Sequence, residues 1–337
     1  MTAPVLLIGD IGGTNARFAL ADPERPAFDQ VVKLACSEYP TALDAIEHYL
    51  DGVGMGRPSG VCLAAAGPIV NGSVRFTNNH WAIDGAELQA QLGARSVRLL
   101  NDFEAIALSL PFLSAGVTQP IGLVAERVRV TADFTVGVLG PGTGLGVAGL
   151  LCRDGLLHPV VGEGGHRGFA PETAQQIEVL SVLRERFERV SDERLLSGPG
   201  LVNIFEALNR VHGSPGERLD AADIFERAQR HEDRLALEAV KLFFEVLGQA
   251  AGNLALELGA FDGIYIAGGI VKRYPDLLEA SGFRAAFEHK GRHRSLMERT
   301  PTHLITHDDP GLLGAAYGAL SDQGAATTTS PEKRTGS

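Results

Sequence analysis

Two glycine-rich loops hold the residues whose types and spacing best fit phosphate chemistry. The first is Gly9-Asp10-Ile11-Gly12-Gly13-Thr14-Asn15, and the second is Gly140-Pro141-Gly142-Thr143-Gly144-Leu145-Gly146. Glycines let a backbone turn tightly and approach a ligand with no Cβ in the way. Successive N–H groups in such a loop form a concavity that suits anionic oxygens. The pattern therefore predicts two loops that together hold a phosphate-bearing ligand.

Apolar runs stand on both sides of each loop, so we expect two strand–loop–strand units. Residues 5–8 and 17–21 flank the first loop, and residues 134–139 and 147–151 flank the second. Neither loop contains the Gly-Lys-Ser/Thr of a P-loop, and neither has the spacing or the following helix of a dinucleotide-binding loop. A tight hairpin without a ligand is the alternative for either loop alone. Two similar units indicate two related halves.

Asp10 places a carboxylate inside a loop that is expected to hold phosphates. That charge makes sense if Mg²⁺ lies between Asp10 and the phosphates, because hard oxygen ligands bind this ion, often through water. The alternative is an aspartate that caps its own turn. Arg17, just beyond the loop, is equally consistent with a phosphate contact and with a place on the strand surface.

Asn101 and Asp102 follow the apolar run 97–100 and precede the helical pattern 103–110. Ligands usually bind polar groups at the carboxyl ends of strands in an open α/β sheet. A carboxylate there could accept the proton of a hydroxyl group that attacks a phosphate. The alternative for Asp102 is a buried helix N-cap.

Around these residues, short apolar runs alternate with helical patterns, which indicates an α/β fold. The 337 residues suffice for two domains with sizeable cores. We expect a strand over 61–66 that is buried on both faces, a strand over 263–267, and a polar loop over 158–169. Helices are expected over residues 41–50, 84–92, 103–110, 173–189, 201–211, 221–229, 234–258 and 312–320.

Composition restricts the partners and the compartment. The net charge of −11 argues against nucleic acid as the main partner, since phosphate backbones bind basic surfaces. Three scattered cysteines fit a reducing compartment. The sequence has no secretory signal and no apolar run long enough to span a membrane. We therefore expect a cytoplasmic protein without a membrane partner.

Five segments, in the same order, resemble bacterial glucokinases of the actin-like ATPase superfamily of sugar kinases. They are Gly9 to Arg17, Leu100-Asn101-Asp102-Phe103, the Gly140–Gly146 loop, Gly162-Glu163-Gly164-Gly165-His166 and Ile266-Ala267-Gly268-Gly269-Ile270-Val271. Related kinase and repressor families carry a zinc-binding cysteine cluster after the Gly-Gly-His segment. Residues 167–189 contain no cysteine, so the resemblance is to the zinc-free group.

The resemblance implies a role for each matching residue. Asp102 would be the catalytic base, and Asp10 would hold Mg²⁺, through water. The sugar would contact Asn78, Asn101, Asp102, Glu163, His166 and Glu193. ATP would contact Gly9, Asp10, Gly12, Gly13, Thr14, Asn15, Gly140, Gly142, Thr143, Gly144, Gly268 and Gly269.

The resemblance also implies an activity and an architecture. The expected reaction transfers the γ-phosphoryl group of ATP to the 6-hydroxyl group of glucose, the first step of glycolysis. The family's assembly is a homodimer.

The expected fold is a two-domain actin-like ATPase (ribonuclease H-like) α/β fold with an interdomain cleft. A small domain would comprise residues 1–111 plus 307–321, a large domain residues 112–306, and a disordered tail residues 322–337. There are two alternatives. One is a kinase for mannose, fructose or N-acetylglucosamine, and the other is an ATP- and sugar-binding sensor without catalysis.

Overall fold

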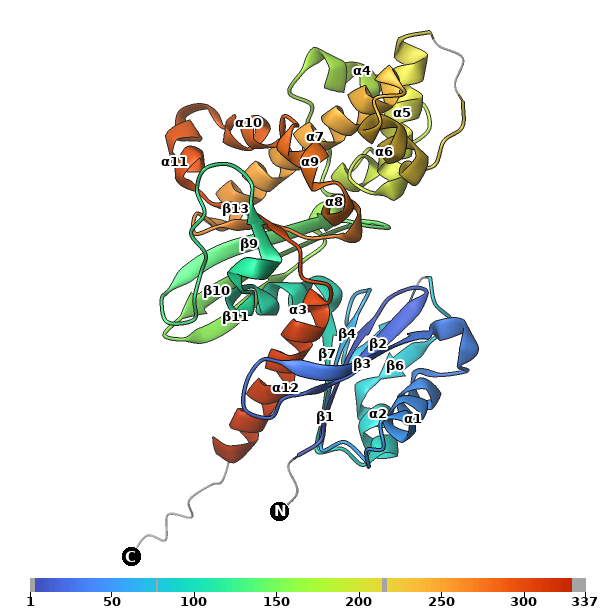
Figure 1. Cartoon of the computed structure of the whole chain (residues 1–337), viewed down its shortest axis with the longest axis vertical. Helices are drawn as coiled ribbons and strands as arrows, with labels where there is room; N and C mark the ends of the chain where they lie inside the picture. Colours follow the sequence, from blue (N-terminus) through green and yellow to red (C-terminus); the bar gives the residue numbers. More distant parts are fainter. Residues whose placement is uncertain (1–3, 77, 214–216, 329–337) are drawn as a thin grey trace, which may run out of the picture. The chain divides into compact units, whose positions relative to one another are not determined.

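The chain forms two compact units in a computed structural model, which describes residues 4–76, 78–213 and 217–328 (Figure 1). The first unit comprises Met1–Phe112 and Asp308–Ser337, and the second comprises Leu113–His307. The sequence analysis placed the two boundaries one residue earlier, after residues 111 and 306. The C-terminal segment thus returns to the unit that the N-terminal segment begins.

A five-stranded mixed sheet forms the centre of the first unit. Its order is β3 (Phe28–Ala35), β2 (Asn15–Ala21), β1 (Leu6–Ile11), β4 (Gly60–Ala65) and β7 (Ser96–Asn101). The first three strands pair antiparallel, whereas β4 and β7 run parallel to β1. Every residue of β4 is buried, which confirms the predicted strand with two covered faces. The carboxyl ends of β1, β4 and β7 therefore meet at one edge of the sheet.

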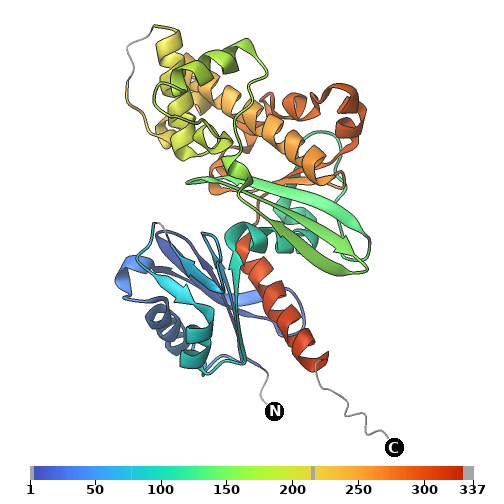
Figure 2. The ribbon, with the colours of Figure 1, turned by 180° about the vertical axis from the view of Figure 1, so that it is seen from behind.

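Helices cover both faces of this sheet, as Figures 1 and 2 show. On one face lie α1 (Ala42–Gly52) and α2 (Gly85–Leu92), and on the other lie α3 (Asp102–Ser109) and α12 (Pro310–Thr328). A small hairpin, β5 (Ser73–Arg75) with β6 (Ala82–Asp84), stands apart from the main sheet. Helix α12 begins two residues earlier than expected and continues past residue 321, where the disordered tail was expected to begin. Residues 329–337 of that tail lie outside the described residues.

The second unit repeats the same strand arrangement. Its order is β11 (Leu156–Val161), β10 (Leu145–Arg153), β9 (Phe134–Pro141), β12 (Ile264–Ile266), β13 (Thr302–Ile305) and β8 (Thr118–Pro120). The first three strands again pair antiparallel, and β12 and β13 are parallel to β9. Strand β8 is an addition at the edge. This common order confirms the two related halves that the pair of glycine hairpins indicated.

Helices gather beside the sheet of the second unit (Figures 1 and 2). They are α4 (Ala174–Leu183), α5 (Gly198–Val211), α6 (Ala221–Gln229), α7 (Arg234–Leu258), α8 (Gly269–Arg273), α9 (Pro275–Glu279), α10 (Phe283–Glu288) and α11 (Arg294–Arg299). Helix α7 has the predicted bounds and ends at Gly259, whose φ of +64° is the left-handed conformation of a helix C-cap. Leu254 and Leu258 of α7 contact the sheet where Gly137 and Gly149 leave room for them.

Three expected elements of the second unit differ in the structure. The expected loop over 158–169 begins with strand residues, because β11 extends to Val161 on the sheet edge. The helix expected over 173–189 ends at Leu183. After that end, Phe187 lies under the Arg194 guanidinium, 4.2 Å from it, instead of continuing a helical face. Helix α5 starts at Gly198 rather than residue 201, since Ser197 caps the Gly-Pro-Gly segment through the N–H of Gly200.

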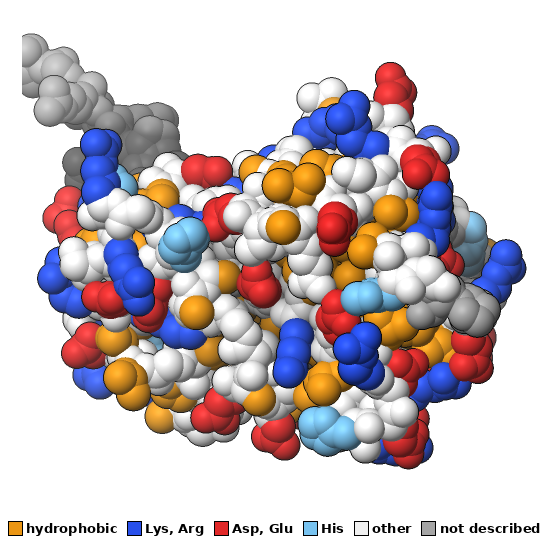
Figure 3. All heavy atoms as spheres, turned by 90° about the horizontal axis from the view of Figure 1, so that it is seen from above, with side chains coloured by type: hydrophobic (Ala, Val, Ile, Leu, Met, Phe, Trp, Pro, Cys, Tyr) orange, Lys and Arg blue, Asp and Glu red, His pale blue; other side chains and the backbone are white. Residues whose placement is uncertain are grey.

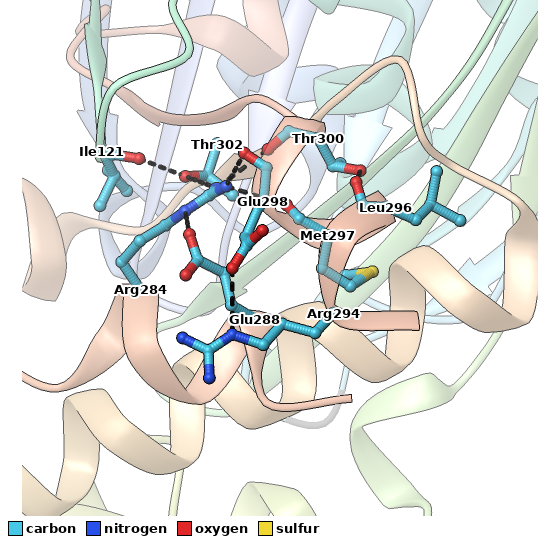
Figure 4. A network of polar contacts seen from close by, with 9 residues as sticks. All are labelled: Ile121, Arg284, Glu288, Arg294, Leu296, Met297, Glu298, Thr300 and Thr302. Atoms are coloured by element: carbon cyan, nitrogen blue, oxygen red, sulfur yellow. Dashed lines mark hydrogen bonds and ion pairs between the residues drawn. The ribbon is translucent and has the colours of Figure 1, made fainter. Parts of the chain in front are cut away.

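Arg284 connects α10 to α11 and to the segment that enters β13, as Figure 4 shows. Its Nε donates to Glu288 at 2.6 Å, and its Nη1 donates to the Thr300 carbonyl and the Thr302 hydroxyl at 2.9 and 3.0 Å. Its Nη2 donates to two backbone carbonyls of α11 at 2.9 and 3.1 Å. One side chain thus fixes three segments of the second unit.

The surface drawn in Figure 3 carries acidic and basic side chains that are interspersed. Among residues 4–76, 78–213 and 217–328, no helix is both long enough and apolar enough to cross a bilayer.

Candidate active site

The first glycine loop is a tight turn between β1 and β2. The Gly12 N–H donates to the Asn15 carbonyl at 2.9 Å, and the Thr14 carbonyl accepts from the Cys36 N–H at 2.9 Å. Asn79 donates its side-chain Nδ2 to the Gly12 carbonyl at 3.3 Å. A Cβ on Gly13 would lie 3.0 Å from the Cβ of Asn78. The loop of Asn78 and Asn79 therefore packs directly against the predicted phosphate loop.

Asp10 stands at the end of β1 beside the start of α12. A Cβ on Gly311 would lie 3.1 Å from the Asp10 carboxyl group, so the glycine permits this close approach. Burial raises the pKa of Asp10 to about 6. The Arg17 guanidinium opposes this shift, and the charges of Asp102 and Asp309 add to it. The first unit thus gathers three carboxylates from elements far apart in the sequence.

Arg17 forms an ion pair with Asp309, with 3.1 Å between Nε and Oδ1. Sequence analysis left Arg17 open and interpreted Asp309 only as part of a helix start. The ion pair joins β2, just after the phosphate loop, to the start of α12. The only sequence signal for it was the Asp-Pro-Gly segment at residues 309–311, which is typical of any helix start.

Asn101, rather than Asp102, caps helix α3. The Asn101 Oδ1 accepts from the N–H groups of Phe103 and Glu104 at 3.0 and 3.3 Å, and Glu104 completes a capping box. The Asn101 Nδ2 donates to the Gly67 carbonyl at 3.2 Å. Asn101 therefore keeps one amide hydrogen for a ligand. Asp102 is the first helical residue, and its Oδ1 accepts from the Phe103 N–H at 2.9 Å.

The second glycine loop joins β9 to β10 and is bound to the start of α5. The Gly142 N–H donates to the Gly144 carbonyl at 2.8 Å, and the Gly142 carbonyl accepts from the Gly198 N–H at 2.9 Å. The Leu145 N–H donates to Oε2 of Glu193 at 2.9 Å. A Cβ on Gly144 would overlap the same carboxylate. Glu193, a predicted sugar contact, thus lies against this predicted phosphate loop.

The third glycine turn lies beside this loop, because β12 pairs with β9. A Cβ on Gly140 would lie 2.7 Å from the Ala267 carbonyl, and one on Gly268 would overlap the Pro141 carbonyl. Gly268 has a φ of +101°, a backbone conformation that is strained for a residue with a side chain. Gly269 then begins α8. The predicted contacts for phosphate and nucleoside are therefore adjacent in the second unit.

The remaining sugar candidates of the second unit lie together on one side of β10. His166 is in the short helix η4 (Gly164–His166), and its N–H donates to the Glu163 carbonyl at 3.0 Å. The His166 Nδ1 lies 3.8 Å from Oε1 of Glu193, which is in helix η5 (Asp192–Arg194). The side chains of His166 and Glu193 are 57% and 30% exposed, so both are accessible to a ligand.

The structure thus brings the predicted residues together in two sets, one in each unit. Asp10, the loop at 12–15, Asn78, Asn101 and Asp102 belong to the first unit. The loop at 140–146, Glu163, His166, Glu193 and Gly268-Gly269 belong to the second unit. Sequence reasoning missed Asn79, Arg17 with Asp309, and the residues that hold His166 beside Glu193.

Comparisons with known proteins identify the family. The glucokinase family profile matches residues 7–322. A glucokinase of Caulobacter sp. (strain K31) is 43% identical over 322 residues, which are 95% of this chain and 96% of that protein. The chain belongs to the glucokinase family. A second family member, from Tolumonas auensis, is 42% identical and matches 93% of this chain and 96% of its own length.

Solved structures of glucokinases share the fold of this family member. The crystal structure of a glucokinase from an Antarctic psychrotroph has a TM-score of 0.85 at 33% identity, and the match covers 95% of this chain and all of that one. The glucokinase of Balamuthia mandrillaris, solved in complex with glucose, has a TM-score of 0.74 at 25% identity, with 94% and 93% covered. The predicted two-domain actin-like fold of sugar kinases is therefore confirmed.

Proposed function

We propose that this chain transfers the γ-phosphoryl group of ATP to the 6-hydroxyl group of glucose and releases glucose 6-phosphate and ADP. This reaction is the first step of glycolysis. The observation that carries the proposal is the similarity to glucokinases over 95% of the chain.

Asp102 is the proposed catalytic base. A hydroxyl group that attacks the γ-phosphate must lose a proton, and a carboxylate within hydrogen-bond reach can orient the hydroxyl and accept the proton. The position of Asp102 at the end of β7, in the unit that holds Asp10 and the first glycine loop, supports this role. The free amide hydrogen of Asn101 would bind a neighbouring sugar hydroxyl group.

The glycine loops are the proposed phosphate contacts. Their backbone N–H groups and the hydroxyl groups of Thr14 and Thr143 would hold the phosphates. In phosphoryl transfer, positioning and charge stabilisation supply most of the catalysis. Gly268 and Gly269 would hold the nucleoside. Apart from its chain neighbours and its own helix backbone, no atom of the described residues lies within 4 Å of the place where a Cβ on Gly269 would be.

The proposed glucose contacts are six polar side chains. They are Asn78, Asn101, Asp102, Glu163, His166 and Glu193. Carboxylate, amide and imidazole groups suit a sugar, because each ring hydroxyl group is both a donor and an acceptor.

Asp10 is the proposed Mg²⁺ contact, and its surroundings fit that ion. The Asp10 carboxylate interacts with the negative charges of Asp102 and Asp309 and with the positive charge of Arg17. Within the described part of the chain, no three His, Cys, Asp or Glu side chains lie close enough to form a metal cage. The proposed ion would be held by the Asp10 carboxylate through water and by the phosphates. When bound, Mg²⁺ would neutralise phosphate charge.

We also propose that the protein is a cytoplasmic homodimer. Free, buried thiols at Cys36, Cys62 and Cys152 are consistent with a reducing compartment.

The edge strand β11 carries the exposed apolar side chains of Leu156, Val160 and Val161, which could contribute to a homodimer interface. Light scattering at several protein concentrations would test the homodimer, and a monomer at all of them would contradict it.

The test of the proposed reaction is ADP release from Mg·ATP with glucose, mannose, fructose, N-acetylglucosamine or no sugar. We expect release with glucose, together with formation of glucose 6-phosphate. Preference for another hexose would keep the mechanism and change the substrate. Nucleotide binding without sugar-dependent ADP release would instead identify a sensor.

A further inference from the structure

Arg167 uses all three guanidinium nitrogens within the second unit. Its Nε donates to Oδ2 of Asp192 at 2.5 Å, and its Nη1 donates to Oε1 of Glu257 at 3.0 Å. Its Nη2 donates to the Ala250 carbonyl at 3.1 Å. Glu257 and Ala250 belong to the long helix α7. The guanidinium group thus joins the segment after η4 to η5 and to a rigid helix.

These contacts involve the direct neighbours of two proposed sugar ligands. Arg167 follows His166, and Asp192 precedes Glu193. The backbones also pair, because the Asp192 N–H donates to the Arg167 carbonyl at 3.0 Å. The short antiparallel pairing continues at Gly168 and Ser191. The ion pair and the backbone bonds therefore fix the η4 segment against the η5 segment.

The side chains of His166 and Glu193 differ in how they are held: the Glu193 carboxylate accepts from the Leu145 N–H at 2.9 Å, whereas the His166 ring lies 3.8 Å from that carboxylate. They are 57% and 30% exposed. By contrast, Arg167 is 25% exposed and Asp192 only 7%. Asp192 is therefore the most buried of the four side chains, and its ion pair with Arg167 lies directly beside the exposed side chain of His166.

We propose that Arg167 is a positioning residue for sugar binding: through Asp192 and α7 it holds His166 and Glu193 at the separation that glucose requires. The inference rests on the proposed function, in which these two residues bind glucose. Arg167 does not itself touch the sugar.

The chemistry of the site explains why arginine serves here. Three acceptors lie in three directions around one planar group, and a lysine ammonium cannot reproduce that geometry. Arg167 and Asp192 also line a cavity of about 190 Å³ with the amides of Gln249 and Asn253. Loss of the guanidinium group would open this polar space to water and leave the Asp192 carboxylate buried without its counter-charge.

The experiment compares Arg167→Gln and Arg167→Lys with the unchanged full chain in steady-state kinetics, well below the melting temperature. We expect Arg167→Gln to raise the KM for glucose about 10- to 100-fold, because small displacements of binding groups have effects of that size. The KM for ATP should rise less than the KM for glucose, because Arg167 contacts neither glycine loop. Arg167→Lys should recover part of the loss, since it keeps the charge.

The matched control is Arg227→Gln. Arg227 forms a two-fold hydrogen-bonded ion pair with Glu217, at 2.7 and 3.0 Å, on the same unit but away from the sugar candidates. This variant should leave both KM values unchanged. An equal rise of the glucose KM in the control would contradict a specific role for Arg167.

A double variant, Arg167→Met with Asp192→Leu, separates positioning from stability. An apolar pair removes the buried charge, so the melting temperature should return toward that of the unchanged protein. The KM for glucose should stay raised, because the three-way contact is still missing. Recovery of both quantities would show that Arg167 serves stability alone and would overturn the proposal.

His166→Ala and Glu193→Gln distinguish a failure of this inference from a failure of the proposed function. If neither raises the KM for glucose, the proposed sugar contacts are wrong. If both raise it and Arg167→Gln does not, the contacts stand and the positioning role of Arg167 is wrong.

Discussion

The carboxylate of Glu193 accepts a hydrogen bond from the backbone N–H of Leu145, with 2.9 Å between Oε2 and N. One residue thus contacts the loop proposed for ATP phosphates, while its other oxygen lies 3.8 Å from His166. The Glu193 side chain therefore lies next to both the proposed phosphate loop and another proposed sugar contact. Within the second unit, the position of the proposed sugar contacts is therefore linked to the conformation of the phosphate loop.

Gly144→Ala tests this link. The added Cβ would overlap the Glu193 carboxylate and displace it, so we expect kcat/KM for glucose to fall about 10- to 100-fold. Steady-state kinetics measure the change. Gly116→Ala is the control, since a Cβ there would meet only the tip of the Ser114 side chain, at 3.9 Å. Equal activity of the two variants would contradict the link.

Asp102→Asn tests the proposed base. The amide can still hydrogen-bond a sugar hydroxyl group but cannot accept its proton, so kcat should fall about 10²- to 10⁴-fold. Glucose affinity, measured by calorimetry, should stay within about tenfold, because the shape of the site is kept. Near-native turnover of this variant would remove Asp102 from the role of base.

The glycine hairpins and the longest helix could be predicted from the sequence because their signals are local. Apolar runs on both sides of a glycine loop define each hairpin, and Gly259 ends α7 wherever the helix packs. The end of strand β11 was missed because residues 158–169 are polar and rich in glycine, which is typical of a loop. Its Pro159 is tolerated because β11 is the edge strand of its sheet.

The groupings of side chains could not be predicted, because they depend on which strands become neighbours. Asp10 interacts with Asp102 only because β1, β4 and β7 pair in parallel. The ion pair of Arg17 with Asp309 requires the C-terminal helix to return to the first unit. The contacts of Arg167 with Asp192 and Glu257 likewise depend on where the fold places α7.

Asp10→Asn tests the consequences of the raised pKa of Asp10. Since burial raises this pKa from 3.8 to about 6, the folded state binds the proton more tightly than the unfolded state does. Above about pH 6 the ionised Asp10 carboxylate therefore lowers the free energy of unfolding. This destabilisation disappears as the pH falls and the group binds its proton. At about pH 7.5 the variant, without nucleotide, should melt a few degrees higher than the unchanged protein.

This stabilisation should shrink with falling pH and vanish below about pH 4, where both states hold the proton. Scanning fluorimetry across this range measures it, and activity with Mg·ATP should be lost at every pH. Asp51→Asn, at an exposed position of the same unit, is the control and should melt like the unchanged protein. If Asp10→Asn melted at a lower temperature than the unchanged protein at about pH 7.5, the predicted stabilisation by this substitution would be wrong.

Arg284→Ala tests the network of Figure 4. The side chain is 18% exposed, and its loss leaves the Thr300 carbonyl and the carboxylate of Glu288 without their donor. We expect a loss of about 3 kcal/mol in the free energy of unfolding. The melting temperature should fall by roughly 6 to 12 °C. Calorimetry measures both.

Arg294→Ala is the control from the same network. Its ion pair with Glu298 joins two exposed side chains, 65% and 47% accessible, and such pairs contribute at most about 0.5 kcal/mol. The two arginines differ because Arg284 donates to three backbone carbonyls outside its own helix, whereas Arg294 connects positions of a single helix turn. If both variants had the same melting temperature, the Arg284 network would stabilise the second unit no more than a surface ion pair does.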